Sequence, residues 1–392
     1  MSTVVGGSDT MHPHSIRAIA LIVFLSTGAT AASAQDLVFT DGFGSGDLWG
    51  WSGFPGGSTA VGACPTEVTV RGTAFFVDPI LGSDVTGDGS FGSPWASIQH
   101  VVDSEVDCTD RYGVPRNPGA PVKGGDAIVL VGAAGHTPNL EITGCYNPEW
   151  VTIRAETPHE PVLASVHFRG SGFWRIEGLS FFNDANGTMV RVEDHGTQGP
   201  ANNIQLVNNH FTSGDLPTIQ DWVDHVSDAM RLYVDDGPLV VRCNEMVNVA
   251  MGFVVGGSHT DVIGNTVEYF SRDGIATGGH FNRFIGNRIY DSVKLGDGHH
   301  DDFFQSHMGA NPDLSSDVEI TGNIFVNRYG SGQPADTLGP TQCLSAFEDG
   351  PKTRIRITNN VCKGDHWHGI TSYATTTSVI VNNIAVGGTH GA

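Results

Sequence analysis

The stretch TDVIGNTVEYFSRDGIATGGHFNRFIGNRIYDS, Thr260 to Ser292, contains one unit written twice. An apolar-alternating segment ends in Gly-Asn at Asn265, and the same arrangement returns 22 residues later at Asn287. The series continues at Asn209, Asn244, Asn323, Asn360 and Asn383, with successive spacings of 35, 21, 22, 36, 37 and 23 residues along the seven. The short spacings match one coil of a parallel β-solenoid, and the long ones match a coil with an insertion of about 14 residues. A single coil cannot bury its apolar face, so the coils must stack.

The repeated Asn is expected at a turn, stacked on the same residue of the next coil. Asn tolerates left-handed backbone dihedrals, and its amide can hydrogen-bond to an identical amide one coil away. The repeat therefore predicts an all-β chain, a single right-handed parallel β-helix over residues 71–392 with a helical cap at its N-terminal end.

Composition narrows the range of partners. The chain has 392 residues with 52 Gly, which suits one turn-rich elongated domain plus a leader. Its formal net charge is −22, with 20 basic residues. Such a surface repels nucleic acid and anionic membranes, so neither is expected as a partner. We expect a monomer.

The first 34 residues are typical of a secretory signal, with translation starting either at Met1 or at Met11. Arg17 supplies the positive end, Ala18 to Leu25 the apolar core, and Ala32 to Ala34 the small-residue cleavage site. Residues 35–70 are interpreted as an N-terminal strand and linker. No later segment is apolar and long enough for a bilayer. The mature protein is predicted to be secreted or periplasmic.

Six Cys fit an oxidising compartment. They form no CxxC pair, which argues against a zinc site. Cys108 with Cys145 and Cys343 with Cys362 are plausible bridges, and Cys243 is interpreted as a core residue, although the connectivity is not fixed by sequence.

The cap is predicted from Phe75 to Asp103. Ser93-Pro94 supplies a helix N-cap and first-turn proline, and Ile98, Val101 and Val102 share one apolar face. A short helix across an open coil covers its core. This opening, with its Gly-Ser-Asp turn and Ser-Pro step, resembles that of secreted proteins of the pectin-lyase-like superfamily. The resemblance implies the right-handed parallel β-helix and a carbohydrate-active role.

The strand after each Asn turn can be aligned on one inward apolar residue. The next residue should face outward, giving a column of Arg191, Arg231, Val254, Ala276, Gln305, Glu348 and Thr371, which Arg169 extends. The residue opening each strand gives a second column of Asp228, Met251, Asp273, Asp302, Ser345 and His368. Arg matches carboxylate geometry, so the Arg row predicts an anionic polymer; the alternative is pairing with neighbouring Asp and Glu. The insertions should wall a groove beside this face.

The densest group of reactive side chains is KLGDGHHDDFFQSH, Lys294 to His307. His299, His300, Asp301 and Asp302 precede Gln305, and this resembles a His-x-Asp-x-x-Gln element of uncharacterised members of the superfamily. An imidazole next to a carboxylate can move a proton near neutral pH. The alternative is a polar, solvated loop.

A partial resemblance to polygalacturonase-type hydrolases covers three short elements. Arg272 to Ile275, Asp301 to Phe303 and Trp367 to Ile370 follow the order Asp-Gly-Ile, Asp-Asp-Cys, Gly-His-Gly. A whole extra coil separates the Asp pair from His368, and the final Arg-Ile-Lys element has no counterpart after it.

Three functions stay open. The leading one is a lyase or C5 epimerase acting on a uronate polysaccharide, in which Arg231, Arg191 or Ca²⁺ neutralises the carboxylate and His300 or Lys294 abstracts the C5 proton. The second is inverting hydrolysis by Asp273, Asp301 and Asp302. The third is a non-catalytic carbohydrate binder.

Each hypothesis assigns roles to the same face. The candidate catalytic residues are His300, Asp302, Asp301, Asp273, Arg231 and Lys294. The candidate substrate-binding residues are Arg169, Arg191, Gln305, Glu348, His368 and His299. Asp273 and Asp302 are also a candidate Ca²⁺ site, because hard cations prefer carboxylate oxygens. No organic cofactor is expected.

Overall fold

The fold is a right-handed parallel β-helix. The computed structural model describes residue 64 and residues 71–133, 135–136, 138–235, 237–306, 316–327, 340–346, 352–364, 366, 368–372 and 375–387. Within these residues, three long sheets contain eleven, nine and nine strands, and every pair of neighbouring strands within them is parallel. Residues 1–34 and 35–70, predicted as signal and linker, lie outside the described part of the chain except for Cys64.

From β4 onward, each coil runs through sheet 1, sheet 2 and sheet 3 in that order. Sheet 1 consists of β1 Ala74–Val77, β2 Ala127–Leu130, β4 Tyr146–Ala155, β7 Gly172–Glu177, β10 Asn202–Val207, β13 Leu239–Arg242, β16 Thr260–Ile263, β19 Arg283–Ile285, β22 Glu319–Thr321, β26 Arg356–Thr358 and β30 Val379–Val381. Sheet 2 consists of β5 Val162–Leu163, β8 Ser180–Phe182, β11 His210–Thr212, β14 Glu245–Val249, β17 Thr266–Phe270, β20 Arg288–Ser292, β23 Ile324–Val326, β27 Val361–Gly364 and β31 Ile384–Gly387.

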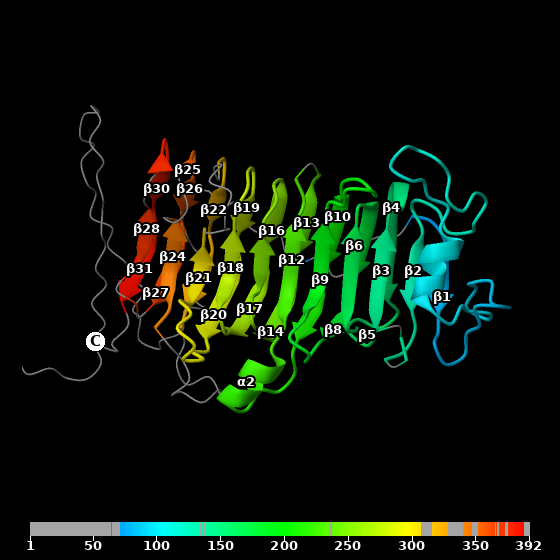
Figure 1. Cartoon of the computed structure of the whole chain (residues 1–392), viewed down its shortest axis with the longest axis horizontal. Coiled ribbons are helices and arrows are strands. Elements are labelled where there is room, and N and C mark those ends of the chain that lie inside the picture. The colour runs from blue at the N-terminus through cyan, green and yellow to red at the C-terminus, as the bar shows by residue number, and fades with distance from the viewer. Residues whose placement is uncertain are drawn as a thin grey trace, which may run out of the picture. The chain divides into compact units, whose positions relative to one another are not determined.

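Sheet 3 completes the coil and carries the predicted site. It consists of β3 Asn139–Thr143, β6 Ser165–Arg169, β9 Thr188–Glu193, β12 Asp228–Tyr233, β15 Phe253–Val255, β18 Asp273–Thr277, β21 Asp302–Gln305, β24 Gln342–Ala346 and β28 Ile370–Ser372. The remaining elements are α1 Ile98–His100, the π-helical turn η2 Val101–Glu105, α2 Ile219–His225, and the strand pair β25 Lys352–Thr353 and β29 Thr375–Thr376. In Figure 1 the sheet 3 strands lie side by side, from β3 near the cap to β28 at the red end.

The predicted Asn stack is confirmed. The side-chain N–H of each repeat Asn donates to Oδ1 of the next, at 2.9–3.0 Å, from Asn209 through to Asn383. The backbone N–H of each donates to that same oxygen. Each rung lies between a sheet 1 strand and a sheet 2 strand. The ladder satisfies polar groups inside the apolar stack, where an unpaired amide would be costly.

We expected the ladder Asn itself to take the left-handed backbone conformation. In the structure the residue before it does so. Positive φ angles of 55–68° occur at Asn208, Cys243, Gly264, Gly286, Gly322, Asn359 and Asn382. The Gly-Asn and Asn-Asn dipeptides therefore divide two tasks. The first residue takes the backbone conformation that most side chains avoid, and the second provides the amide.

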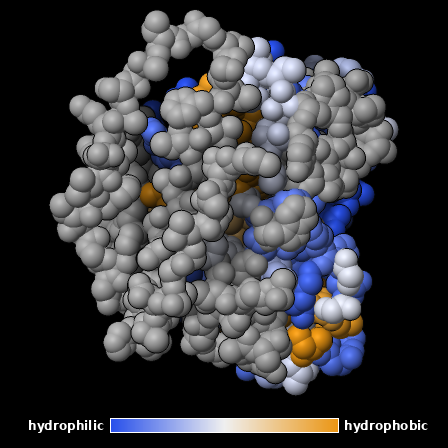
Figure 2. Space-filling model, turned by 90° about the vertical axis from the view of Figure 1, so that its left-hand side faces the viewer, coloured by the Kyte–Doolittle hydropathy of each residue, from blue (hydrophilic) through white to orange (hydrophobic). Residues whose placement is uncertain are grey.

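The interior is filled by aromatic and aliphatic side chains from all three sheets. Phe181 and Phe211 stack on consecutive coils with ring centroids 4.7 Å apart, and Phe303 contacts both Phe270 and Phe325. All five are fully buried. At the end of the described stack opposite the cap, Val379 to Val381 of β30 are exposed. Figure 2, which faces that side, shows apolar surface next to hydrophilic surface.

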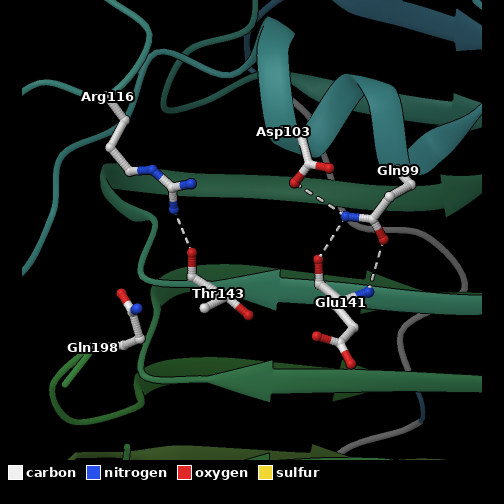
Figure 3. Close-up of a pocket in the computed structure, with 6 residues that line it drawn as sticks. All are labelled: Gln99, Asp103, Arg116, Glu141, Thr143 and Gln198. Carbon is white, nitrogen blue, oxygen red and sulfur yellow. Dashed lines mark hydrogen bonds between the residues drawn. The ribbon is translucent and has the colours of Figure 1, made fainter. Parts of the chain in front are cut away.

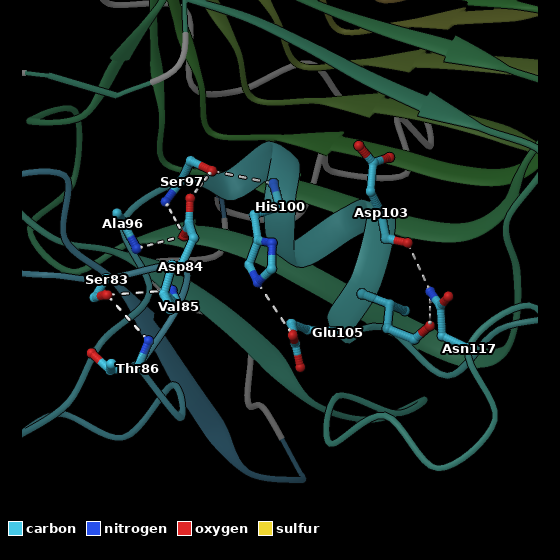
Figure 4. A network of polar contacts seen from close by, with 11 residues as sticks. Ser83, Asp84, Val85, Thr86, Ala96, Ser97, His100, Asp103, Glu105 and Asn117 are labelled. Atoms are coloured by element: carbon cyan, nitrogen blue, oxygen red, sulfur yellow. Dashed lines mark hydrogen bonds and ion pairs between the residues drawn. The ribbon is translucent and has the colours of Figure 1, made fainter.

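The cap forms on the predicted face but starts later than predicted. Ile98, Val101 and Val102 are buried, as expected. The N-cap is Ser97, whose hydroxyl accepts from the His100 amide. The Asp84 carboxylate accepts from the amides of Ala96 and Ser97 and from the Ser97 hydroxyl (Figure 4). Ser93-Pro94 instead lies in the preceding turn, because Asp84 fixes the chain three residues further on.

Two predicted disulfides are confirmed and one residue was misread. Cys108–Cys145 and Cys343–Cys362 form. Cys243 is not a free core residue, since it is bonded to Cys64, 179 positions earlier. None of the helices in the described part of the chain has the length and apolar character needed to span a bilayer.

Each of the three long coils has an insertion at the corner between sheets 2 and 3, as predicted, and the second coil has a further long connection between sheets 3 and 1, from Gln305 at the end of β21 to Glu319 at the start of β22. The first, residues 213–227, contains α2, which is held by a capping box of Thr218 and Asp221 and stands off the corner in Figure 1. Its Trp222 is buried in a small apolar cluster with Tyr269 and Val293. The second is residues 293–301, and the third, 327–341, lies largely outside the described residues.

Candidate functional site

Sheet 3 presents an outward column that runs the length of the coils. Register pairs join His167, Arg191, Arg231, Val254, Ala276, Gln305, Ser345 and Thr371. The prediction was right for Arg191, Arg231 and Gln305. It was wrong for Arg169, because the register partner of Arg191 is His167 and Arg169 pairs with Glu193 instead. It was also wrong for the coil of β24, where Ser345 rather than Glu348 occupies the column. Glu348 itself lies outside the described residues.

The strand-opening column differs at one coil for the same reason. Asp273, Asp302 and Gln342 are register partners on β18, β21 and β24. Ser345 was predicted where Gln342 lies, because the sequence alignment placed Phe347 inward. The inward residue is Leu344, the partner of Phe304. Two apolar residues three positions apart both satisfied the pattern, and the insertion before this strand removed the spacing that would have separated them.

Three carboxylates form a buried floor where β18 and β21 begin. Asp273, Asp301 and Asp302 are 8%, 3% and 0% exposed. The Asp302 amide donates to Oδ1 of Asp273 at 3.1 Å. Carboxylates this well buried interact electrostatically only with groups in direct contact with them. Two basic side chains, Lys294 and His300, lie against them.

The first base is Lys294, in the 293–301 insertion. Its Nζ lies 3.4 Å from Oδ1 of Asp301 and donates to the carbonyl of His299. Burial is the largest influence on Asp301 and raises its pKa to about 7, although the Lys294 ammonium lowers it and nearby Asp273 raises it further. The buried Oδ2 of Asp301 has no hydrogen-bond partner in the described part of the chain.

The second base is His300, whose side chain is 52% exposed. Its Nδ1 lies 3.9 Å from Oδ2 of buried Asp302. The Gln342 amide contacts the same ring, at 2.9 Å from Nδ1, and its oxygen lies 3.3 Å from Nδ1 of His368. His366 joins the group, with its ring centroid 5.3 Å from that of His300 and 5.4 Å from that of His368.

Sequence reasoning missed Gln342 and His366. The signal for His366 was the His-x-His pair that opens the last aligned strand, of which only His368 was chosen. His299 is exposed, and its backbone rather than its ring holds the loop, since its N–H donates to Asp297. Gln305 is half-buried and follows Phe304 on β21.

The three Arg of the face are paired with carboxylates. Arg191 binds Glu193 and Arg231 binds Asp228, each with Nη2 at 2.6 Å. Arg169 lies 3.7 Å from both Glu141 and Glu193. The pairing alternative raised from the sequence is thus what the structure contains.

The Ca²⁺ site at Asp273 and Asp302 stays a prediction. In the residues that the structure describes, no three His, Cys, Asp or Glu side chains converge as a metal site requires. Of the pair expected to bind Ca²⁺, Asp273 directs one oxygen at the Asp302 amide.

A polar hollow of about 390 Å³ lies elsewhere, beside the cap. Gln99 donates to Asp103 and to the Glu141 carbonyl and accepts from the Glu141 amide, and Arg116 donates to the Thr143 carbonyl (Figure 3). These bonds attach the cap to β3. The hollow contains none of the predicted site residues, and we assign it a structural role.

No protein-family model and no curated protein matches the chain. Among solved structures, it is similar to a rhamnogalacturonan lyase, at 12% identity and a TM-score of 0.47, over 80% of this chain and 87% of that one. It is also similar to a GH136 lacto-N-biosidase from Eubacterium ramulus, at 11% identity and a TM-score of 0.41, over 81% and 68%. A third is a mannuronic acid specific polysaccharide family 6 lyase from human gut microbiota, at 12% and 0.32, over 64% and 78%. What this chain does must be sought in its own residues.

Proposed function

We propose that the chain is a secreted carbohydrate-active enzyme that acts on an acidic polysaccharide by β-elimination. The observation that carries the proposal is an exposed imidazole, His300, and an ammonium, Lys294, each set against a buried carboxylate. A base oriented by a carboxylate can take a proton from carbon, and a neighbouring ammonium can stabilise the charge that develops.

The roles follow from these positions. His300 takes the proton from C5 of a uronate, and Asp302 stabilises the imidazolium that results. The electrons of the C–H bond form the C4–C5 double bond, the C4–O bond to the next sugar breaks, and the leaving oxygen takes a proton from water. Lys294 faces the uronate carboxylate, where its charge favours the developing anion. Arg231, earlier considered for this task, lies three coils from Asp302, about 14 Å at the usual strand spacing.

The second candidate function is inverting glycoside hydrolysis. The observation in its favour is Asp301, whose pKa of about 7 suits a general acid. Against it stands the burial of all three carboxylates, since a general acid must reach the glycosidic oxygen and a base must reach a water.

The test is incubation of the purified protein with a panel of uronate polymers and neutral polysaccharides. Product with the ultraviolet absorbance of an unsaturated uronate supports the lyase. A changed uronate composition without cleavage supports the epimerase, which starts with the same proton abstraction. New reducing ends without absorbance support the hydrolase. Polymer binding without any product overturns the enzyme proposal. Repeating the assay with a chelator tests Ca²⁺ at Asp273 and Asp302.

A further inference from the structure

The N-terminal half of the sheet 3 face carries a second organised group of charges, outside the reaction centre. Arg191 on β9 and Arg231 on β12 are register partners, so their guanidinium groups project from adjacent coils of the same face. The two side chains are 46% and 36% exposed. They are therefore available to a ligand lying along the sheet.

Both guanidinium groups are held in the same way. Nε of Arg191 donates to Oε2 of Glu193 at 2.7 Å, and Nη2 reaches that oxygen as well. Nε and Nη2 of Arg231 bind Oδ2 of Asp228 at 2.7 and 2.6 Å. A guanidinium has five N–H donors. The carboxylate engages two of them in each case, and Arg231 has a further hydrogen bond to Tyr233, so three remain on Arg191 and two on Arg231.

The anchoring carboxylates are themselves fixed. Asp228 is buried, and Glu193 also accepts from His167 at 2.9 Å on the preceding coil. Arg191 also lies over the ring of Tyr233, 5.9 Å from its centroid. The forks are therefore oriented before any ligand arrives, which reduces the entropy lost on binding.

We propose that Arg191 and Arg231 form a subsite that binds the carboxylates of a uronate polymer at a distance from the reaction centre. This inference rests on the proposed function and deepens it. The free edge of each guanidinium matches a carboxylate. The outward column continues from Arg231 through Val254 and Ala276, which are 5% and 3% exposed, to Gln305, so the two Arg and the reaction centre lie along one line of the same face.

The distance sets the length of ligand required. Arg231 lies three coils and Arg191 four coils from the coil of Asp302, about 14 and 19 Å at the usual strand spacing. A sugar bound only at His300 cannot reach either Arg. The affinity should therefore depend on the two Arg for polymers and not for monosaccharides.

Binding is measured by calorimetry in a His300→Ala background, so that no substrate is consumed. The probes are polygalacturonate, alginate and the methyl ester of polygalacturonate, which keeps the sugar and removes the charge. Arg191→Gln and Arg231→Gln are each expected to weaken binding of the preferred uronate polymer by at least about tenfold, with no such loss for the ester. Arg283→Gln is the matched control, because Arg283 forms a similar pair with Asp261 on sheet 1.

Removing one Arg leaves a carboxylate without its cation, so folding is checked by circular dichroism. Arg231→Lys keeps a cation beside Asp228 but loses the fork, and the double variant Asp228→Asn/Arg231→Gln removes the pair together; both are expected to weaken binding. Equal losses in Arg231→Gln and Arg283→Gln, or no affinity of the parent for either uronate polymer, would overturn the subsite. Arg-dependent uronate binding without turnover in the wild-type protein sinks the lyase and keeps the subsite. Unsaturated product from a uronate polymer whose binding does not depend on either Arg keeps the lyase and overturns the subsite, and cleavage of only neutral polysaccharides overturns both.

Discussion

Asp301 links the stability of the protein to pH through a single buried carboxyl group. Its pKa is raised to about 7 from its ordinary value of 3.8, with burial as the largest cause. Below pH 3.8, Asp301 is protonated in both the folded and the unfolded chain. Between about pH 4 and pH 7 only the folded chain keeps the proton, so the contribution of Asp301 to the free energy of unfolding falls as pH rises.

Asp301→Asn should therefore stabilise the protein at pH 8 and have little effect at pH 4, because Asn resembles the protonated carboxyl. The shift corresponds to at most about 4 kcal/mol across the window. Urea unfolding of both proteins at the two pH values measures it. The control is Asp317→Asn, since Asp317 lies in an exposed pair with Arg354 that lowers its pKa. A destabilised Asp301→Asn at pH 8 would show that its bond to Lys294 outweighs burial.

His300 and Asp302 are predicted to act as one unit in turnover. His300→Ala should lower kcat by about 10²–10⁴, the range for a lost proton-transfer group, while leaving the melting temperature nearly unchanged because the ring is exposed. Asp302→Asn should lower kcat in the same direction by removing the charge beside the imidazolium. His225→Ala, on α2, is the control. Wild-type rates in both variants would move the reaction centre to His368 and its neighbours.

The sequence predicted correctly those site residues that lie close together along the chain. Lys294, His300, Asp301 and Asp302 belong to one insertion and the strand after it, so the repeat placed them without three-dimensional information. Gln342 joins from the next coil, after the insertion of residues 327–341. Its place depends on whether Leu344 or Phe347 faces inward, and hydrophobicity alone does not decide that.

The ladder is the element that fixes the coils in register. Within it the Asn287 side chain donates to Asn323 and to the Val262 carbonyl and accepts twice from Asn265. The sequence predicted this stack from spacing. It did not separate the amide position from the left-handed position, because the dipeptide always carries both.

Asn287→Ala is predicted to cost about 3–5 kcal/mol of unfolding free energy, since it removes four buried hydrogen bonds and leaves their partners unsatisfied. Asn383→Ala removes a similar set at the half-exposed last rung, where water can replace it, and should cost less. Chemical denaturation compares them. Equal costs would indicate that the ladder is not protected from solvent.

At the scale of the whole molecule, the strands of each sheet pair only with those of neighbouring coils, so the solenoid can unfold from an end. Cys64–Cys243 is the exception, because it joins the chain just before β1 to the coil of β13, five strands away along sheet 1. The N-terminal coils are thus enclosed in one covalent loop. The sequence did not predict it, since a bridge between distant coils leaves no spacing signal.

Replacing Cys64 and Cys243 by Ser should destabilise the protein by about 2 kcal/mol more than replacing Cys343 and Cys362, since loop entropy grows with the 179 against 19 residues separating the partners. Thermal and urea unfolding of the two double variants measure the difference. Limited proteolysis should then cut first among the N-terminal coils. A larger cost for the shorter bridge would show that local packing, not loop closure, sets its contribution.

The insertion corner between sheets 2 and 3 has a consequence for how such a scaffold can change. One residue added between a strand and its Asn would displace a rung and break its bonds to two coils. An added segment at residues 213–227 costs only loop closure, which grows slowly with length. Added length is therefore accommodated at the corners that border sheet 3 and not at the ladder corner between sheets 1 and 2. New specificities can be grafted there, on the border of the face that carries His300, while the stack beneath is inherited unchanged.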